Sequence, residues 1–246
     1  MSVYLKPDTH QYFDHIGIEY LPISRVLAYF KSPFDPEKMS YLSARKKIKL
    51  EGNLNPTEDQ IRERQVILKA EWKEKARKAA DHGTKIHDNL DHFCSTSKIL
   101  DPELESMTRG VISYFIKYPV TLQEQVLYSS ECRIAGTADK LCFRTKGAKS
   151  TIDIYDYKTN LSKGIEYYSK YGNFMSGPVS HLECCNFNHY ALQLSLYALL
   201  IELEKERVIG RLSIIFIPPN NPSLYRLIPV PYMKYEAMAM IDEIDK

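Results

Sequence analysis

Two neighbouring segments of the chain constrain its fold most, because apolar and polar residues alternate in both with a period of two. The alternation covers 136–143 and 151–157 and is typical of half-buried β-strands. The polar stretch between them, 145–150, contains a glycine and favours a turn. The pattern therefore predicts an antiparallel hairpin that brings Asp139 on the first strand close to Asp156 on the second.

The charged residues on this hairpin suggest a chemistry. Lys158 lies two positions after Asp156, so both side chains point to the same face of the strand. Carboxylate oxygens are ligands that Mg²⁺ prefers, and such an ion activates a bound water for attack on a phosphate. Lys158 would orient that water or stabilise the negative charge of the transition state. The alternative is an ordinary hairpin with solvated acids and a surface lysine.

Four motifs follow one another along the chain in a fixed order, and two of them belong to the hairpin. They are Glu71-Trp72 followed by 79–87, then 136–139, 156–159 and 193–197. Together they resemble the PD-(D/E)xK nuclease superfamily, in particular its RecB-like branch, and the resemblance covers 70–202. Two departures, Ala138 in place of the name-giving proline and Asp156 in place of glutamate, both fit that branch. Residues 10–27 are similar to the entry segment of mitochondrial genome maintenance exonucleases and their phage-encoded relatives.

The resemblance implies a fold. It is an α/β fold with a restriction-endonuclease-like core, in which a mixed central sheet is flanked by helices, and with a helical N-terminal extension. We expect a single nuclease domain over 1–246, with the extension at 1–56 and the core at 57–246.

The resemblance also implies the site residues. The catalytic residues would be Asp139, Asp156 and Lys158. The metal ligands would be His87, Asp139, Asp156 and Tyr157, with Mg²⁺ or Mn²⁺ as the cofactor. The residues that bind nucleic acid would be Ser24, Thr159, Gln193 and Tyr197.

Three further residues near the acids need separate arguments. A histidine on a helix is more often a surface or core residue than a ligand, but Gly83 lets this helix approach the sheet and favours His87 as a ligand. Neutral imidazole is a less typical ligand of Mg²⁺ and also suits Mn²⁺, so we expect activity with Mn²⁺. Glu124, on the preceding strand, is a secondary site residue that would support the site or contact a metal-bound water. Asp153 is expected on the other face of its strand, in a structural contact.

A helix and an irregular stretch border the predicted site. His189, Gln193 and Tyr197 are spaced to form one stripe of that helix, although the polar side chains there could simply bond the backbone at its edge. Residues 160–185 predict no regular structure and are rich in aromatic side chains. These aromatics would stack on unpaired bases or, alternatively, pack together as a surface loop.

Composition excludes several classes of protein. A chain of 246 residues with 44% apolar content can bury one core but has no room for a helicase or motor. The net charge is only +2, so a nucleic-acid surface must be local, and the basic run 45–49 is a candidate phosphate contact. Five cysteines without paired or metal-type spacing predict a reducing compartment, with no disulfides, iron–sulfur cluster or zinc. We expect no signal peptide, transit peptide or membrane span, and hence a cytoplasmic protein of a bacterial or phage-infected cell.

Periodicity and capping signals predict the remaining elements. We expect a hairpin at 12–20, a helix after Ser24, a break at 33–36, a long helix from Thr57 to about Phe93, strands over 122–143, 151–157, 211–217 and 224–230, and a last helix from Met233.

Three functions fit these observations. The first is a metal-dependent DNA exonuclease that acts on single strands or on ends in replication, recombination or repair. The second is an endonuclease, since both actions need the same site. The third is a nucleic-acid-binding protein that kept the fold without the chemistry, but Asp139, Asp156 and Lys158 are all present and favour catalysis.

Overall fold

The computed structural model describes residues 2–118, 120–146, 149–159, 164–205, 207–218 and 224–244. The chain divides into two compact units. One comprises Met1–Ser32 together with Lys85–Lys246, and the other is Pro33–Thr84. The expected single domain, with an extension at 1–56 and a core at 57–246, stays a prediction. No helix in the described ranges combines the length and the apolar character that a bilayer crossing requires.

The first unit is built on one sheet. Its strands within the described ranges are β1 (Val3–Lys6), β2 (Gln11–Asp14), β3 (Glu19–Pro22), β4 (Val120–Ser129), β5 (Ile134–Lys146), β6 (Lys149–Lys158), β7 (Val208–Phe216) and β8 (Arg226–Val230). They run in the order β1-β2-β3-β5-β6-β7-β8, and β4 pairs with β5. The β3–β5 and β6–β7 pairs are parallel and the others are antiparallel, so the sheet is mixed.

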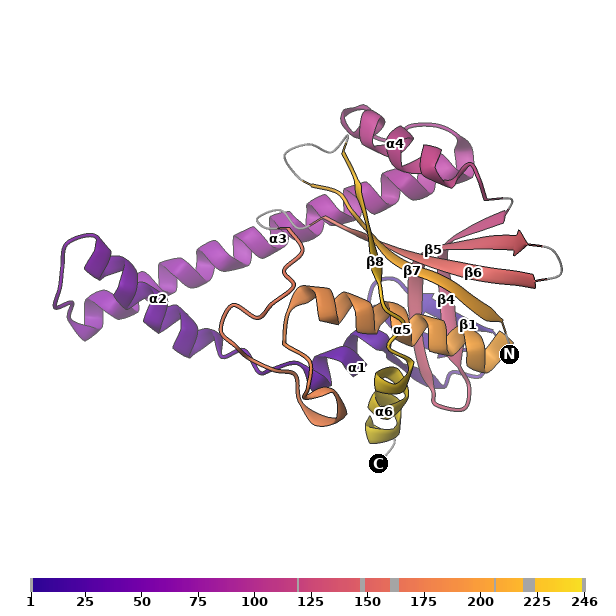
Figure 1. The fold of residues 1–246 in the computed structure, drawn as a ribbon. Coiled ribbons are helices and arrows are strands. Elements are labelled where there is room, and N and C mark those ends of the chain that lie inside the picture. Colours follow the sequence, from indigo (N-terminus) through magenta and orange to yellow (C-terminus); the bar gives the residue numbers. More distant parts are fainter. Residues whose placement is uncertain are drawn as a thin grey trace. The chain divides into compact units, whose positions relative to one another are not determined.

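Helices cover both faces of this sheet (Figure 1). The helices are α1 (Ile23–Phe30), α3 (Glu58–Thr96), α4 (Glu105–Phe115), α5 (Asn186–Lys205) and α6 (Lys234–Ile244), with short 3-10 turns η1 (Pro102–Leu104) and η2 (Gly177–Val179). Helices α1, α5 and α6 pack on one face, whereas α4 and the final turns of α3 pack on the other. The predicted α/β fold with a mixed sheet between helices is confirmed, and it is consistent with a restriction-endonuclease-like core.

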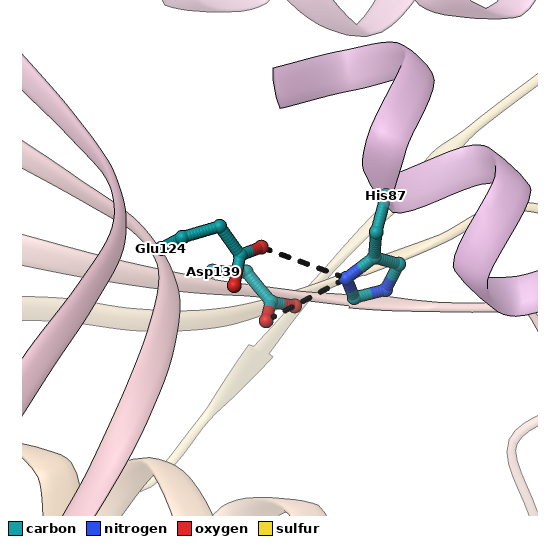
Figure 2. Close-up of side chains that lie close together, drawn as sticks. All are labelled: His87, Glu124 and Asp139. Atoms are coloured by element: carbon teal, nitrogen blue, oxygen red, sulfur yellow. Dashed lines mark ion pairs between the residues drawn. The ribbon is translucent and has the colours of Figure 1, made fainter. Parts of the chain in front are cut away.

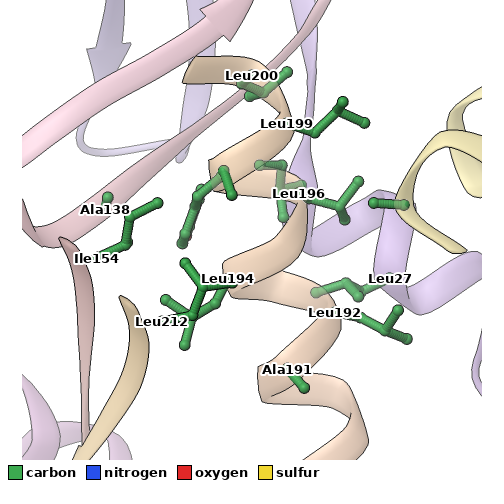
Figure 3. Packing of buried hydrophobic residues seen from close by; sticks show 14 of the residues in the cluster. Leu27, Ala138, Ile154, Ala191, Leu192, Leu194, Leu196, Leu199, Leu200 and Leu212 are labelled. Carbon is green, nitrogen blue, oxygen red and sulfur yellow. The ribbon is translucent and has the colours of Figure 1, made fainter. Parts of the chain in front are cut away.

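The alternation read from the sequence sorts the strand side chains between these two faces. On β6, Ile152 and Ile154 belong to the core under α5, while Tyr155 and Tyr157 belong to the core under α3 and α4. Figure 3 shows how the leucines of α5 fill the first core against Ala138, Ile154 and Leu212 of the sheet. Helix α5 is hydrophobic on most sides because α1 and α6 cover the faces turned away from the sheet.

The predicted hairpin is confirmed as β5 and β6. Their register pairs Leu141 with Ile154 and Phe143 with Ile152. Gly147 and Ala148 of the predicted turn lie outside the described residues, as do residues 160–163 of the stretch left without regular structure. The rest of that stretch contains only η2 and one isolated bridge between Phe174 and Glu183.

Several boundaries differ from the predictions. The N-terminal region forms three strands where a single hairpin was expected, whereas the strands expected over 122–143 are present as β4 and β5. Helix α3 continues to Thr96, and α4 was not predicted at all. Helix α4 has an apolar stripe at Met107, Val111 and Phe115, so its signal is present in the sequence.

The second unit consists of α2 (Pro36–Leu50) and the beginning of α3. Asp35 caps α2 by accepting a hydrogen bond from the Lys38 backbone N–H at 2.9 Å. A small core of alanine, isoleucine and leucine joins the two helices. The basic run 45–49 lies on α2, where Lys47 pairs with Glu71 at 3.8 Å, so part of that run has an acidic partner that the local sequence did not reveal.

Asp153 holds the centre of the sheet together, as its place on the opposite strand face predicted. It is fully buried and accepts hydrogen bonds from Tyr118 Oη (3.0 Å), Arg144 Nη2 (3.1 Å) and the Arg211 backbone N–H (2.8 Å). The space for its carboxylate exists because Gly210 has no side chain, since a Cβ there would lie 2.1 Å from Asp153 Oδ1.

We therefore expect Gly210→Ala to destabilise the protein by roughly 1–3 kcal/mol, because the added methyl group overlaps a buried carboxylate that cannot move without losing its donors. Urea denaturation would measure the change. Gly164→Ala is the matched control, because a Cβ there meets its nearest atom, Arg226 Nη2, at 3.5 Å. Equal stability of the two variants would contradict this role of Gly210.

Candidate metal centre

The site forms along the edge of β5 that faces β3 and β6, where neither strand pairs with residues 136–139. Strand β4 occupies the other edge from 134 to 143. On the site edge, β3 pairs only with Ile134 and Ala135, and β6 pairs only from Lys140 onwards. Residues 136–139 therefore lie where β3 and β6 diverge. Asp139 uses this gap: its Oδ2 accepts a hydrogen bond from the Tyr157 backbone N–H at 2.6 Å.

Three side chains from three elements converge on this gap (Figure 2). His87 Nδ1 on α3 lies 3.7 Å from Asp139 Oδ1 on β5 and 3.9 Å from Glu124 Oε1 on β4. One ligand atom of each residue lies within 4.8 Å of the others. Two ligands of one Mg²⁺ ion, each at about 2.1 Å, lie at most roughly 4.2 Å apart, so these oxygen and nitrogen donors fit a divalent cation after small movements.

The backbone of Glu124 takes an unusual conformation. Its φ is +42°, in the left-handed region that non-glycine residues rarely adopt. The pairs Gln123–Lys140 and Gln125–Ala138 flank it, so the distortion affects one residue opposite Asp139. Such strain costs of order 1–3 kcal/mol and is concentrated at functional positions. It strengthens the case for Glu124, which the sequence placed only in a supporting role, as a metal ligand.

Asp156 and Lys158 complete the group at the end of β6. Asp156 is 2% exposed, and its Oδ2 forms an ion pair with Lys158 Nζ. Lys158 Nζ also lies 4.8 Å from the centre of the Tyr190 ring. Both residues line a cavity of about 290 Å³ together with His87, Glu124 and Asp139. The structure thus brings the three predicted catalytic residues into one cavity, although Asp156 is not among the three donors that lie within 4.8 Å of one another.

Burial and like charge shift the pKa values of this cluster. Burial, and then the charge of Asp156, raise the pKa of Asp139 to about 7, despite the opposing effects of His87 and Lys158. Burial by itself lowers the pKa of His87, but the Glu124 carboxylate, 3.9 Å from Nδ1, and those of Asp139 and Asp156 raise it to about 9. Burial also lowers the pKa of Lys158, and Asp156 and Asp139 more than reverse this. The negative charge in the cavity raises the pKa values of His87 and Lys158, and it adds to the effect of burial on the pKa of Asp139.

Tyr157, a predicted metal ligand, lies beside the site in a different way. Its backbone N–H holds Asp139, and its ring packs edge-on against the His87 ring with centroids 5.5 Å apart. Its hydroxyl is buried and has no hydrogen-bond partner among the described residues. The side chain therefore supports the two ligands, and its coordination of a metal stays a prediction.

The residues predicted to bind nucleic acid fall into two groups. Ser24, Gln193 and Tyr197 line the cavity, and Gln193 Nε2 donates to Tyr197 Oη at 3.0 Å. Thr159 is half-buried just beyond β6 and does not line it. His189 shares the predicted stripe but contacts Cys184 Sγ at 3.4 Å instead.

The N-terminal strands contribute cavity residues that sequence reasoning missed. Tyr12 and His10 line the cavity, and Tyr12 Oη lies 3.0 Å from Thr137 Oγ1. Both belong to the 10–27 segment, which the resemblance singled out without assigning roles to these residues. Their signal was therefore in the sequence, but their position on β2 and in the preceding turn depends on how β3 pairs with β5.

Comparisons with known proteins give little beyond this geometry. No protein-family model matches the sequence, and no curated protein matches it. Among solved structures, the crystal structure of a protein named "putative exonuclease" from Eubacterium rectale is similar, with 14% sequence identity and a TM-score of 0.38. The match covers 67% of this chain, which spans 64% of the length of that protein.

A divalent cation should stabilise this site measurably. We expect millimolar Mn²⁺ or Mg²⁺ to raise the melting temperature of the wild-type protein, by an amount equivalent to about 2.7 kcal/mol at a hundred times the dissociation constant. Asp139→Asn should lose this response. Without metal it should melt at the same temperature or higher, because one of three crowded carboxylates is neutralised.

The measurement is a thermal melt with and without EDTA. Glu105→Gln is the matched control, since Glu105 is an exposed acid on α4 that pairs with Arg109. A metal response that Asp139→Asn retains in full would place the bound cation elsewhere.

Proposed function

We propose that this chain is a metal-dependent deoxyribonuclease of the RecB-like type, and that it acts as an exonuclease on single-stranded or end-containing DNA during replication, recombination or repair. The observation that carries this function is the meeting of His87, Glu124 and Asp139 with the Asp156–Lys158 pair in one cavity. The order of the four sequence motifs supports the RecB-like branch. The cavity that these residues line supports a substrate that enters from solvent.

The residues divide the work of hydrolysis between them. His87 Nδ1, Glu124 and Asp139 would hold the cation, which when bound lowers the pKa of a water and offsets charge on the phosphate. Lys158 remains protonated because Asp156 and Asp139 raise its pKa, so it serves as a donor and not as a base. Its Nζ would hold the water oxygen or a phosphate oxygen while that water, having released a proton to solvent, attacks phosphorus and the bond to the leaving oxygen breaks. The leaving oxygen would take up a proton from solvent. Asp156 fixes the position of Nζ.

The catalytic roles predict a loss of activity without a loss of folding. Lys158→Ala and Asp139→Asn should each reduce cleavage by at least about a hundredfold, because each removes a group that acts on the transition state or on the cation. Melting temperatures measured beside the rates separate this from unfolding. A folded Asp139→Asn protein that cleaves at the wild-type rate would refute the site.

End dependence separates the exonuclease from the endonuclease. Linear and circular DNA, single- and double-stranded and labelled at the 5′ or the 3′ end, would be incubated with Mg²⁺ or Mn²⁺ and with an EDTA control. Loss of linear DNA alone supports the exonuclease and gives its polarity, whereas cleavage of circles supports the endonuclease. Binding without cleavage of any substrate would favour the non-catalytic alternative.

The aromatic stretch that leads from β6 to α5 offers a surface for the strand. Tyr168, Tyr171 and Phe174 are 77%, 66% and 53% exposed, and Lys170 Nζ lies 5.6 Å from the centre of the Tyr171 ring. Tyr167 instead packs on Phe187, with ring centroids 4.8 Å apart. Tyr167 therefore packs against the protein, whereas the other three aromatic side chains are exposed and lie close to Lys170 in the sequence. We propose that these exposed aromatic side chains stack on unpaired bases.

Tyr168→Ala and Tyr171→Ala should weaken binding of single-stranded DNA by about 1–3 kcal/mol each and affect duplex binding less, because only unpaired bases offer a free face. Fluorescence anisotropy with both substrates measures this. Tyr235→Ala is the matched control, because Tyr235 is 85% exposed on α6. Equal losses on single strands and duplexes would argue against stacking.

A further inference from the structure

Lys140 is a buried cation without a direct carboxylate partner in the part of the chain that the structure describes, and the Asp91 carboxylate on α3 acts on it only at longer range. The residue is 2% exposed, and its Nζ lies 3.6 Å from Cys94 Sγ and 4.8 Å from the centre of the Phe115 ring. It forms no ion pair with any residue that the structure describes. Lys158, at the end of β6, is by contrast paired with Asp156. Because a buried ammonium is unfavourable without a counter-charge, Lys140 is poised to receive one from outside the protein.

A cavity of about 230 Å³ gives access to this lysine. Aromatic and aliphatic side chains, among them Phe93, Phe115 and Tyr118, form most of its wall, and Ser97 and Thr121 add hydroxyl groups. Among the described residues that line it, Lys140 is the only cation and none is a carboxylate. The apolar wall strengthens any electrostatic contact made inside. The cavity is therefore selective for an anion with hydrogen-bond acceptors.

The cavity and the metal centre lie in the same seam between α3 and the β4–β5 pair. His87 and Cys94 are seven residues apart on α3, which is two turns or about 10 Å along one helix face. His87 contacts Glu124 and Asp139, whereas Cys94 contacts Lys140, the residue next to Asp139 on β5. One nucleic-acid strand placed along this seam can reach both.

We propose that the cavity around Lys140 binds a phosphate monoester. The group is either the terminal phosphate of a DNA strand that is engaged at the metal centre or a free phosphate. The first source rests on the proposed nuclease function, and the second does not. A phosphate monoester matches the site because it brings a full negative charge, several acceptor oxygens for Lys140 Nζ and the hydroxyl groups, and a size that the cavity admits.

A thermal melt in inorganic phosphate tests the cavity without any cleavage. Phosphate should raise the melting temperature of the wild type and of Lys140→Arg, compared with sodium chloride at equal ionic strength, and should not raise that of Lys140→Met. Without phosphate, Lys140→Met should melt no lower than the wild type, because it loses an unpaired charge. Lys234→Met, which removes a half-exposed lysine on α6, should keep the phosphate response. A wild type that does not respond to phosphate overturns the free-phosphate site.

Cleavage of single strands that differ only in their ends identifies the source. If the site takes a DNA terminus, the wild type should cleave a strand with a 5′- or a 3′-phosphate at least about tenfold faster than the hydroxyl-ended strand. Lys140→Met should lose this preference and keep the rate on hydroxyl ends. Equal rates on all ends, with the thermal response intact, assign the site to free phosphate. No cleavage of any strand contradicts the nuclease, while the thermal melt still decides the cavity. Equal rates together with no thermal response overturn the proposal.

Discussion

The repulsion between three carboxylates in one cavity is the constraint around which the site is arranged. Glu124, Asp139 and Asp156 face only two cations, protonated His87 and Lys158. Two unit charges about 4 Å apart interact by roughly 4 kcal/mol at an effective dielectric constant near 20, so each added acid is costly. The raised pKa values of Asp139 and His87 express this imbalance. A divalent cation bound there, as proposed, would offset this imbalance, and the crowded acids would then cost stability only while the cation is absent.

The sheet topology makes this crowding possible. A regular strand beside β5 would cover residues 136–139 with backbone. Here the pairing of β5 with β3 stops at Ala135, and its pairing with β6 begins only at Lys140. The Asp139 carboxylate accepts a hydrogen bond from the Tyr157 N–H, which lies beyond the part of β6 that pairs with β5. Gly136 allows α5 to come close here, because a Cβ at this position would lie 2.8 Å from Tyr197 Cε1. The unpaired edge of β5 at 136–139 therefore lets Asp139 line the cavity and leaves room there for the Gln193–Tyr197 pair.

The parts of the site that sequence predicted are those that follow from strand and helix periodicity. Asp156 and Lys158 share a face because they are two residues apart, and Asp139 meets them because the hairpin register is set by alternation. Glu124 lies on the strand before the hairpin, as predicted, but its approach to His87 depends on a φ of +42° that no local pattern predicts. Tyr12 and His10 depend on a pairing between distant segments. That Lys140 forms no ion pair with any described residue likewise depends on how α3 and α4 pack on the sheet, which periodicity does not encode.

Asp139 and Lys140 show how one strand can serve two kinds of charge. Although they are neighbours on β5, both point toward α3, where Asp139 contacts His87 and Lys140 contacts Cys94, and each is buried among groups that leave its charge incompletely balanced. The deficit at Asp139 is positive charge and the deficit at Lys140 is negative charge. Under the proposed function, a metal ion alone would correct only the first, whereas a nucleic-acid strand with its metal would supply both. The charge pattern of the protein would then be complementary to a phosphate-bearing substrate that arrives with its cation, and this complementarity does not depend on which end of the strand enters first.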